Sequence, residues 1–243
     1  MSATGRFFLE EARAVLRRAE EAARQVKRFD LGESGRLNVG LTSSASLHPI
    51  AQAILRTFHD AYPHAEVSVQ ESETYELILA LQDGSIDVAL FHITPDRFPD
   101  LDHIPLAEVE LLVAAPNAHP LASATEPVTL DRLLNEDFVI YRRREGPGIF
   151  NHIQQVFEEA GASIRIAGDV TRLIAAINLV ASGRGITLVP ATMCMLHPES
   201  VTYLPLAADT FSPLPLSLAY RRDERIALVR NFLALTKGAT DGL

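Results

Sequence analysis

The sequence predicts an α/β fold of two modest lobes that follows a long N-terminal helix. Its 243 residues exceed a usual single domain of about 100 to 150 residues, yet are too few for two large domains. From residue 35 onward, short apolar strands alternate with amphipathic helices, and the second half repeats the plan of the first. Hydrophobic residues make up 47% of the chain and charged residues 22%, a composition that supports a packed core.

The segment 6–30 carries a heptad pattern. Its apolar residues recur at spacings of four and three: Phe8, Ala12, Val15, Ala19, Ala22, Val26 and Phe29. Glu20 stands four residues before Arg24, the favourable order for a helical ion pair. A helix with such a stripe must bury it, either on the body of its own chain or against a second chain. Gly32 suits a left-handed cap that ends this helix.

The first half after this helix predicts a strand–helix–strand–helix–strand order. Leu37, Val39 and Leu41 alternate as in a strand, and the apolar run 86–91 is typical of a buried parallel strand. Between them the periodicity predicts, in order, a helix over 47–62, a strand over 65–70 and a helix over 74–83. A proline-rich stretch from Pro95 to Pro105 is expected to interrupt the alternation.

The second half resumes the alternation. We expect strands at 111–115, 138–141, 163–167 and 186–189, and helices at 130–134, 149–160 and 172–182. The tail adds strands near 201–206 and 214–220, then an amphipathic helix for which Asp223 is a plausible N-cap.

Charge and composition narrow the function classes. The formal net charge of −9 repels the phosphates of nucleic acids, so this segment is not expected to hold DNA by itself, although an acidic surface also simply favours solubility. The single cysteine, Cys194, cannot form an internal disulfide, and there is no signal peptide. No apolar stretch approaches the roughly 20 residues that cross a bilayer. The sequence therefore predicts a cytoplasmic protein that does not bind membranes.

Four segments at strand ends are candidates for ligand binding. Ligands of open α/β sheets collect at the carboxyl ends of parallel strands, where backbone N–H groups are exposed. The residues there are Thr42, Ser43 and Ser44 after the first strand, His92 after the third, Tyr141 and Arg142 in the second half, and Pro190 after Val189. Because each half supplies two of these segments, the sequence predicts a cleft between the lobes.

The hydroxyl-rich loop 42–46 joins a strand to a helix, where backbone N–H groups and the helix dipole favour a carboxylate. Two or three charge-assisted hydrogen bonds of about 1.5 to 3 kcal/mol each would support micromolar binding. The alternative is that the serines only cap the helix, and Thr74 shares this ambiguity. His92 either contacts an anion or is structural. Arg142 either faces the cleft or lies in a solvated loop.

Motifs of enzymes and metal sites are absent or weak. The sequence contains no G-x-S-x-G, H-E-x-x-H, P-loop or dinucleotide-binding glycine pattern. His59, Asp60 and His64 form the one cluster with metal-like spacing, but Pro63 separates them at a predicted helix end. We therefore expect no catalytic residues, no metal and no cofactor.

Several short motifs occur in a characteristic order. They are Thr4 to Glu10, Gly35 to Gly40, Tyr62-Pro63, Gly84 to Ala89, His119 to Leu121 and Gly183 to Pro190. In this order they resemble the LysR-type transcriptional regulators, from the linker helix to the C-terminus. The resemblance implies a sensor with a type II periplasmic-binding-protein-like fold behind a linker helix. It also implies a winged helix-turn-helix for DNA ahead of Thr4, which this chain does not include.

The resemblance implies how the chain is divided. Residues 1–32 would form the linker helix through which the protein dimerises or tetramerises. Residues 35–106 and 207–243 would form a discontinuous first lobe, and residues 107–206 the second lobe.

Tyr141-Arg142 with the glycines of 146–148 looks like the subgroup that controls catabolism of aromatic compounds. This subgroup implies an aromatic acid or muconate-like dicarboxylate as effector, bound by Ser43, Ser44, Thr74, the residue at His92, and Pro190 with its neighbours. The subgroup commonly has arginine at the position of His92. We therefore hypothesise a sensor that binds a small organic anion between its lobes and alters DNA binding by the full-length protein. A solute-binding protein of the same shape and an enzyme such as a dehydratase are the alternatives.

Overall fold

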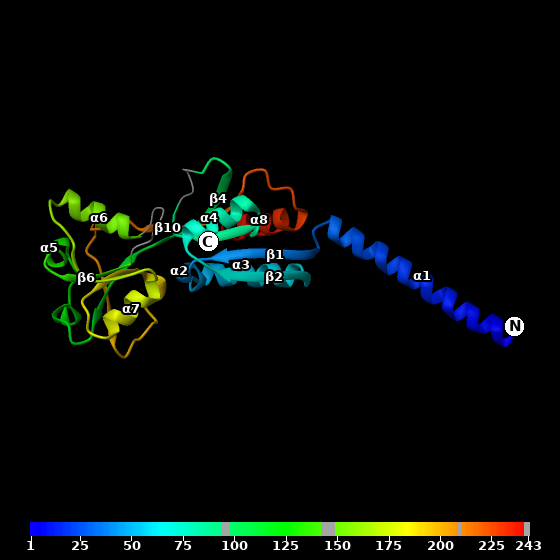
Figure 1. The fold of residues 1–243 in the computed structure, drawn as a ribbon, viewed down its shortest axis with the longest axis horizontal. Coiled ribbons are helices and arrows are strands. Elements are labelled where there is room, and N and C mark those ends of the chain that lie inside the picture. Colours follow the sequence, from blue (N-terminus) through cyan, green and yellow to red (C-terminus); the bar gives the residue numbers. More distant parts are fainter. Residues whose placement is uncertain (94–97, 142–148, 209, 241–243) are drawn as a thin grey trace.

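The computed structural model describes residues 1–93, 98–141, 149–208 and 210–240. It shows an elongated molecule in which two α/β lobes lie next to each other and one long helix projects from the first lobe, on the side away from the second (Figure 1).

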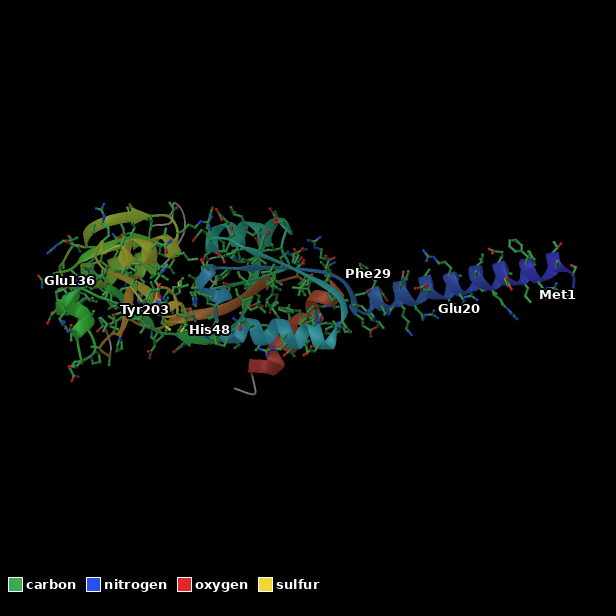
Figure 2. The ribbon with its side chains drawn as sticks, turned by 90° about the horizontal axis from the view of Figure 1, so that it is seen from below. Met1, Glu20, Phe29, His48, Glu136 and Tyr203 are labelled. Atoms are coloured by element: carbon green, nitrogen blue, oxygen red, sulfur yellow. The ribbon has the colours of Figure 1, made fainter. Side chains whose placement is uncertain are left out.

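The projecting helix is α1 (Ala3–Asp30), and it confirms the helix expected over 6–30. Ser2 caps it, since the side chain accepts a hydrogen bond of 3.1 Å from the N–H of Gly5. None of its residues is buried: Phe8 of the apolar stripe is 72% exposed and Val15 67%. Figures 1 and 2 show the helix standing clear of both lobes. The stripe is therefore not covered by the body of its own chain.

The base of α1 is anchored to the last helix of the chain, α8 (Ala227–Thr240). Gly32 has the expected left-handed backbone (φ +68°), and a Cβ there would lie 2.5 Å from the backbone of Ala227. The Asn231 side-chain amide donates to the carbonyl oxygens of Leu31 (3.0 Å) and Gly32 (3.1 Å). Only glycine fits this close approach.

Lobe I is built on a five-stranded sheet of order β2-β1-β3-β10-β4. Its strands are β1 (Ser34–Leu41), β2 (His64–Glu71), β3 (Val88–Phe91), β4 (Leu101–Val109) and β10 (Leu214–Arg221). The first three are mutually parallel, as expected, whereas β10 runs antiparallel to both β3 and β4. α3 (Pro49–Ala61) and α8 pack together on one face through an edge-to-face contact of Phe58 and Phe232, and α4 (Thr74–Asp83) covers the other.

Lobe II has a three-stranded sheet of order β8-β5-β9 and a parallel pair, β6 and β7. These strands are β5 (Leu111–Pro116), β6 (Asp137–Tyr141), β7 (Arg165–Val170), β8 (Thr187–Pro190) and β9 (Val201–Pro205). A bridge between Phe138 and Ile186 joins the two groups. Gly185 makes this approach possible, because its φ is +95° and a Cβ would lie 2.4 Å from the Asp137 carbonyl oxygen. The helices are α5 (Leu130–Leu133), α6 (Ile149–Glu159) and α7 (Leu173–Ala181).

The proline-rich stretch from Pro95 to Pro105 contains part of a strand, contrary to the expectation that it interrupts the strand–helix alternation. β4 runs from Leu101 through Pro105 to Val109. β4 is the edge strand of its sheet, and its register with β10 shifts next to Pro105, between Leu216 and Ser217. Proline lacks an N–H donor, and an edge strand with a bulge tolerates that loss.

The start of the last helix differs from expectation. α8 begins at Ala227 and not after Asp223, and the Glu224 carboxylate accepts the Ile226 N–H (2.7 Å) ahead of the helix. β4 stays paired with β10 up to Val109, and Glu110 separates it from β5 of the second sheet. In the second lobe α6 (Ile149–Glu159) matches the expected helix over 149–160.

Arg221, the last residue of β10, ties this strand to the rest of lobe I. Its guanidinium donates to the carbonyl oxygens of Leu81 (3.0 Å) and Ile86 (2.6 Å). It also pairs with two carboxylates that are almost completely buried, Asp87 (3.3 Å) and Glu224 (2.7 Å). Buried carboxylates are stable only with such partners, so this cluster stabilises lobe I as long as the cation is present.

We predict that Arg221→Met lowers the free energy of unfolding by about 3 kcal/mol, because it leaves two buried carboxylates without their cation. Urea unfolding measures this loss. The matched control is Arg165→Met, which breaks an ion pair with Asp137 whose side chains are more than half exposed and should cost less than about 1 kcal/mol. Equal losses for the two variants would contradict the prediction.

Candidate functional site

The carboxyl ends of β1 and β3 lie together, as the sequence predicted for Thr42 and His92. Leu41 pairs with Leu90, and the N–H of Thr42 donates to the Leu90 carbonyl oxygen (3.1 Å). Thr42 and His92 are both buried. These two residues therefore end neighbouring strands on the side of lobe I where ligands of α/β sheets collect.

The loop after β1 differs from the expected entry into one long helix. It forms a single turn, α2 (Ser43–Ser46), and α3 starts separately at Pro49. Thr42, the N-cap residue of α2, makes no capping hydrogen bond with its side chain, and Ser44 is buried. A four-residue helix has little dipole, so the carboxylate-binding role predicted for this loop would depend on its hydroxyl groups and not on a helix terminus.

Thr74 is the first residue of α4, and its side chain does not cap that helix. The cap is Glu73, which forms a capping box with Glu76. Burial removes the Thr74 hydroxyl from solvent, and its Oγ1 has no hydrogen-bond partner among the described residues. Buried polar groups without partners are rare in proteins. The Thr74 hydroxyl is therefore an exception among the described residues, since it neither caps α4 nor donates to another group.

Ser217 on β10 is a residue that the sequence analysis missed. It is fully buried, pairs in register with Phe91 of β3, and its Oγ has no partner within the described part of the chain. The N–H of Thr42, the residue after β1, donates to the Leu90 carbonyl oxygen, and the Thr42 Oγ1 is likewise buried and unpartnered within that part of the chain. Residues of neighbouring strands that pair in register share a face of the sheet. Phe91 packs against α4, so the Ser217 hydroxyl lies on the face that α4 covers.

Lobe II meets this region through the segment after β8. Pro190 ends the strand and is buried, and the Thr192 hydroxyl donates to the carbonyl oxygen of Ser44 in lobe I (3.0 Å). The structure thus brings the segment 190–192 of lobe II to the segment 42–46 of lobe I, which already lies beside the end of β3. Val189 is completely buried in the hydrophobic core of lobe II.

A second contact crosses between the lobes at the start of α4. The Arg172 guanidinium, just before α7, lies 3.6 Å from the Glu73 carboxylate. Neither residue was among the predicted site residues, because each precedes a helix on a different lobe and only the tertiary structure brings them together.

The remaining predicted residues are Tyr141 and Arg142. Tyr141 is buried as the last residue of β6. Arg142 lies outside the described residues, as does the rest of 142–148.

Comparison with known proteins shows the family. The model of the LysR substrate binding domain matches residues 31–241, which is most of the chain. The chain belongs to the LysR-type transcriptional regulators. Among its relatives are the regulator CatR of Pseudomonas putida, 30% identical over 97% of this chain and 79% of that protein, and YnfL of Escherichia coli, 29% identical over 86% and 70%.

Solved structures agree with this assignment. The LysR family regulator CbnR superimposes with a TM-score of 0.83 at 22% identity, over 97% of this chain and 80% of that one. The effector-binding domain of a BenM variant gives 0.74 at 25% identity, over 86% and 96%. The LysR-type sensor described here therefore has the expected type II periplasmic-binding-protein-like fold, with an N-terminal helix in front of it.

The described residues contain no group of three or more His, Cys, Asp or Glu side chains arranged to hold a metal ion. None of the helices in the described ranges is long and apolar enough to span a membrane.

His48 shapes the loop that carries the serines of this LysR-type site. Its Nδ1 accepts the Ile50 N–H (3.1 Å) and so caps α3. Burial lowers the pKa of the His48 imidazole from its usual 6.5. An imidazole nitrogen accepts a hydrogen bond only when it is not protonated, so this cap depends on the neutral form.

We predict that His48 makes the protein less stable in acid. Its folded-state pKa lies below that of the unfolded chain, so its contribution is complete above about pH 6.5 and disappears as the pH falls through the folded-state pKa. The variant His48→Asn keeps a capping acceptor that does not titrate. Between pH 7 and pH 5 its unfolding free energy should fall less than that of the wild type, by up to about 1 kcal/mol. Identical pH dependence in urea unfolding would refute this role.

Proposed function

We propose that this LysR-type sensor binds a small organic acid between its lobes, against the buried hydroxyls of lobe I. The observation that carries the proposal is the set of three buried hydroxyls without hydrogen-bond partners among the described residues: Thr42, Thr74 and Ser217. A buried polar group left without a partner costs about 1 to 3 kcal/mol. A ligand oxygen that bonds these hydroxyls would recover part of that cost.

The chemical class follows from the surroundings of these hydroxyls. Hydroxyls donate to a carboxylate, and the N-terminal turn of α4 beside Thr74 favours negative charge. Two structural neighbours point the same way: the BenM effector-binding domain binds its effector benzoate, and that of QuiR binds shikimate. Both ligands are monocyclic carboxylic acids. We infer an aromatic or dicarboxylic acid for this chain, with Ser43, Ser44, His92 and Pro190 around it.

The response to the acid requires two arrangements of the lobes. A ligand shifts such an equilibrium only as far as it binds one arrangement better than the other. A single residue, Glu110, separates β4 of lobe I from β5 of lobe II, so this connection is short. Movement of lobe I would then carry α1, whose base is fixed to α8. In a longer protein this movement would change how paired α1 helices present their DNA-binding modules.

We predict that an acid in a panel of benzoates, muconates and catechol derivatives raises the thermal stability of the chain. At 100 times its dissociation constant, a ligand stabilises by about 2.7 kcal/mol. Thr74→Val should weaken binding about tenfold or more, because a charge-assisted hydrogen bond is lost. The same variant should leave the unfolding free energy of the ligand-free protein unchanged or slightly raised, since the hydroxyl has no partner to lose.

The control is Thr202→Val in lobe II, whose hydroxyl donates to Asn117 (2.7 Å). It should lose about 1 kcal/mol of stability and keep the full response to the acid. If an acid binds and Thr74→Val leaves its affinity intact, these hydroxyls are not the site. If no acid stabilises the wild type, the ligand class is wrong.

We also predict that α1 pairs with the same helix of another subunit. Val15→Glu places a charge in the middle of the exposed stripe and should convert the assembly to monomers in sedimentation velocity experiments. Leu16→Glu is the matched control, because Leu16 is equally exposed (64%) but lies outside the heptad positions. A wild-type protein that is monomeric at tens of micromolar, or equal effects of the two variants, would count against pairing through this stripe.

A further inference from the structure

The two contacts between the lobes differ in kind. The bond from Thr192 to the Ser44 carbonyl joins neutral groups and involves the backbone of lobe I. The contact of Arg172 with Glu73 joins two side chains of opposite charge (3.6 Å), and Glu73 immediately precedes Thr74. A charged contact that crosses from lobe II to the edge of the proposed acid site can respond to a charged ligand.

Arg172 and Glu73 differ in their exposure to solvent and in how the dipole of the adjoining helix acts on their charge. Arg172 is the N-cap residue of α7, where a positive charge is disfavoured by the helix dipole, and 55% of its side chain is exposed. Glu73 is the N-cap residue of α4, where a negative charge is favoured, and only 19% of its side chain is exposed. The Glu73 carboxylate is therefore stabilised by the N-terminus of α4. The Arg172 guanidinium has no such support from α7 and can exchange one carboxylate partner for another.

The positive charge of Arg172 also interacts with the Glu76 carboxylate in the first turn of α4. The pKa of the Glu76 carboxyl is lowered chiefly by hydrogen bonds from Ser72 and from the Glu73 backbone, and Arg172 adds a smaller contribution. Negative charge at the start of α4 therefore interacts favourably with this arginine, and a carboxylate bound beside Thr74 would interact with it in the same way.

We propose that Glu73 is an internal competitor of the ligand. Its carboxylate pairs with Arg172 while the site holds no acid, and a ligand carboxylate bound beside Thr74 takes Arg172 in exchange. More than half of the Arg172 side chain is exposed and its distance to Glu73 is long, so the ion pair is weak and a ligand with additional contacts displaces Glu73 readily. Glu73 then remains satisfied by its capping box with Glu76. Arg172 is thus a ligand-binding residue supplied by lobe II, and this inference rests on the proposed acid site.

The test is calorimetric titration of the complete chain with benzoate and with cis,cis-muconate. Glu73→Gln keeps an oxygen that caps α4 and removes the competing charge, so it should tighten binding about threefold. Arg172→Gln should weaken binding about fivefold or more, and Arg172→Lys should restore part of the loss. In the Arg172→Gln background, Glu73→Gln should tighten binding less than in the wild type. Arg165→Gln, which breaks an ion pair within lobe II, should change nothing.

Hydrogen exchange on the ligand-free protein provides an independent measurement. If the pair holds the lobes together, amides at the start of α4 and α7 should exchange faster in Arg172→Gln and Glu73→Gln than in the wild type or in Arg165→Gln. Normal binding by Arg172→Gln, or equal tightening by Glu73→Gln with and without Arg172, would overturn the competition while leaving the acid site intact. If no acid binds even to the wild type, the competition fails together with the proposed function. The exchange rates then still show whether the ion pair forms.

Discussion

The hydrogen bonding of β10 between β3 and β4 holds together parts of the chain that are more than 100 residues apart in sequence. Because this strand closes the sheet of lobe I, the second lobe is an insertion that begins and ends at the same sheet. Arg221 at the end of β10 neutralises Asp87 and Glu224, and Ser217 within β10 brings a hydroxyl to the carboxyl end of β3. A strand far away in sequence thus supplies lobe I with both its buried cation and the Ser217 hydroxyl of the proposed site.

Most elements could be predicted from periodicity, because amphipathic helices and buried strands carry their burial pattern in the sequence. The strand through Pro105 could not, since a proline is compatible with a strand only at an edge, and sequence does not reveal which strand is at the edge. The start of α8 could not be predicted either, since the Ile226 N–H ahead of the helix is bonded by the Glu224 carboxylate and not by the expected cap, Asp223.

The site was predictable to the extent that it lies in loops after strands. Thr42 and His92 follow neighbouring parallel strands, as expected from α/β topology, and Thr192 donates to the Ser44 carbonyl oxygen. Ser217 was not predictable, because its importance comes from its register with Phe91 on a strand distant in sequence. Thr74 looked like a helix cap, and only the geometry shows that Glu73 takes that role and leaves the threonine hydroxyl unused. Glu73 and Arg172 required the contact between lobes.

Because the base of α1 is fixed at Leu31 and Gly32, a rotation of lobe I displaces the far end of this helix much more than its base. At 1.5 Å per residue, the 28 residues of α1 extend about 42 Å from the point where Asn231 holds the base. A rotation of lobe I by about 10° would sweep the far end through about 7 Å, because the displacement grows with distance from the anchored base. A substitution at Gly32 that loosened this joint would let α1 lag behind such a rotation.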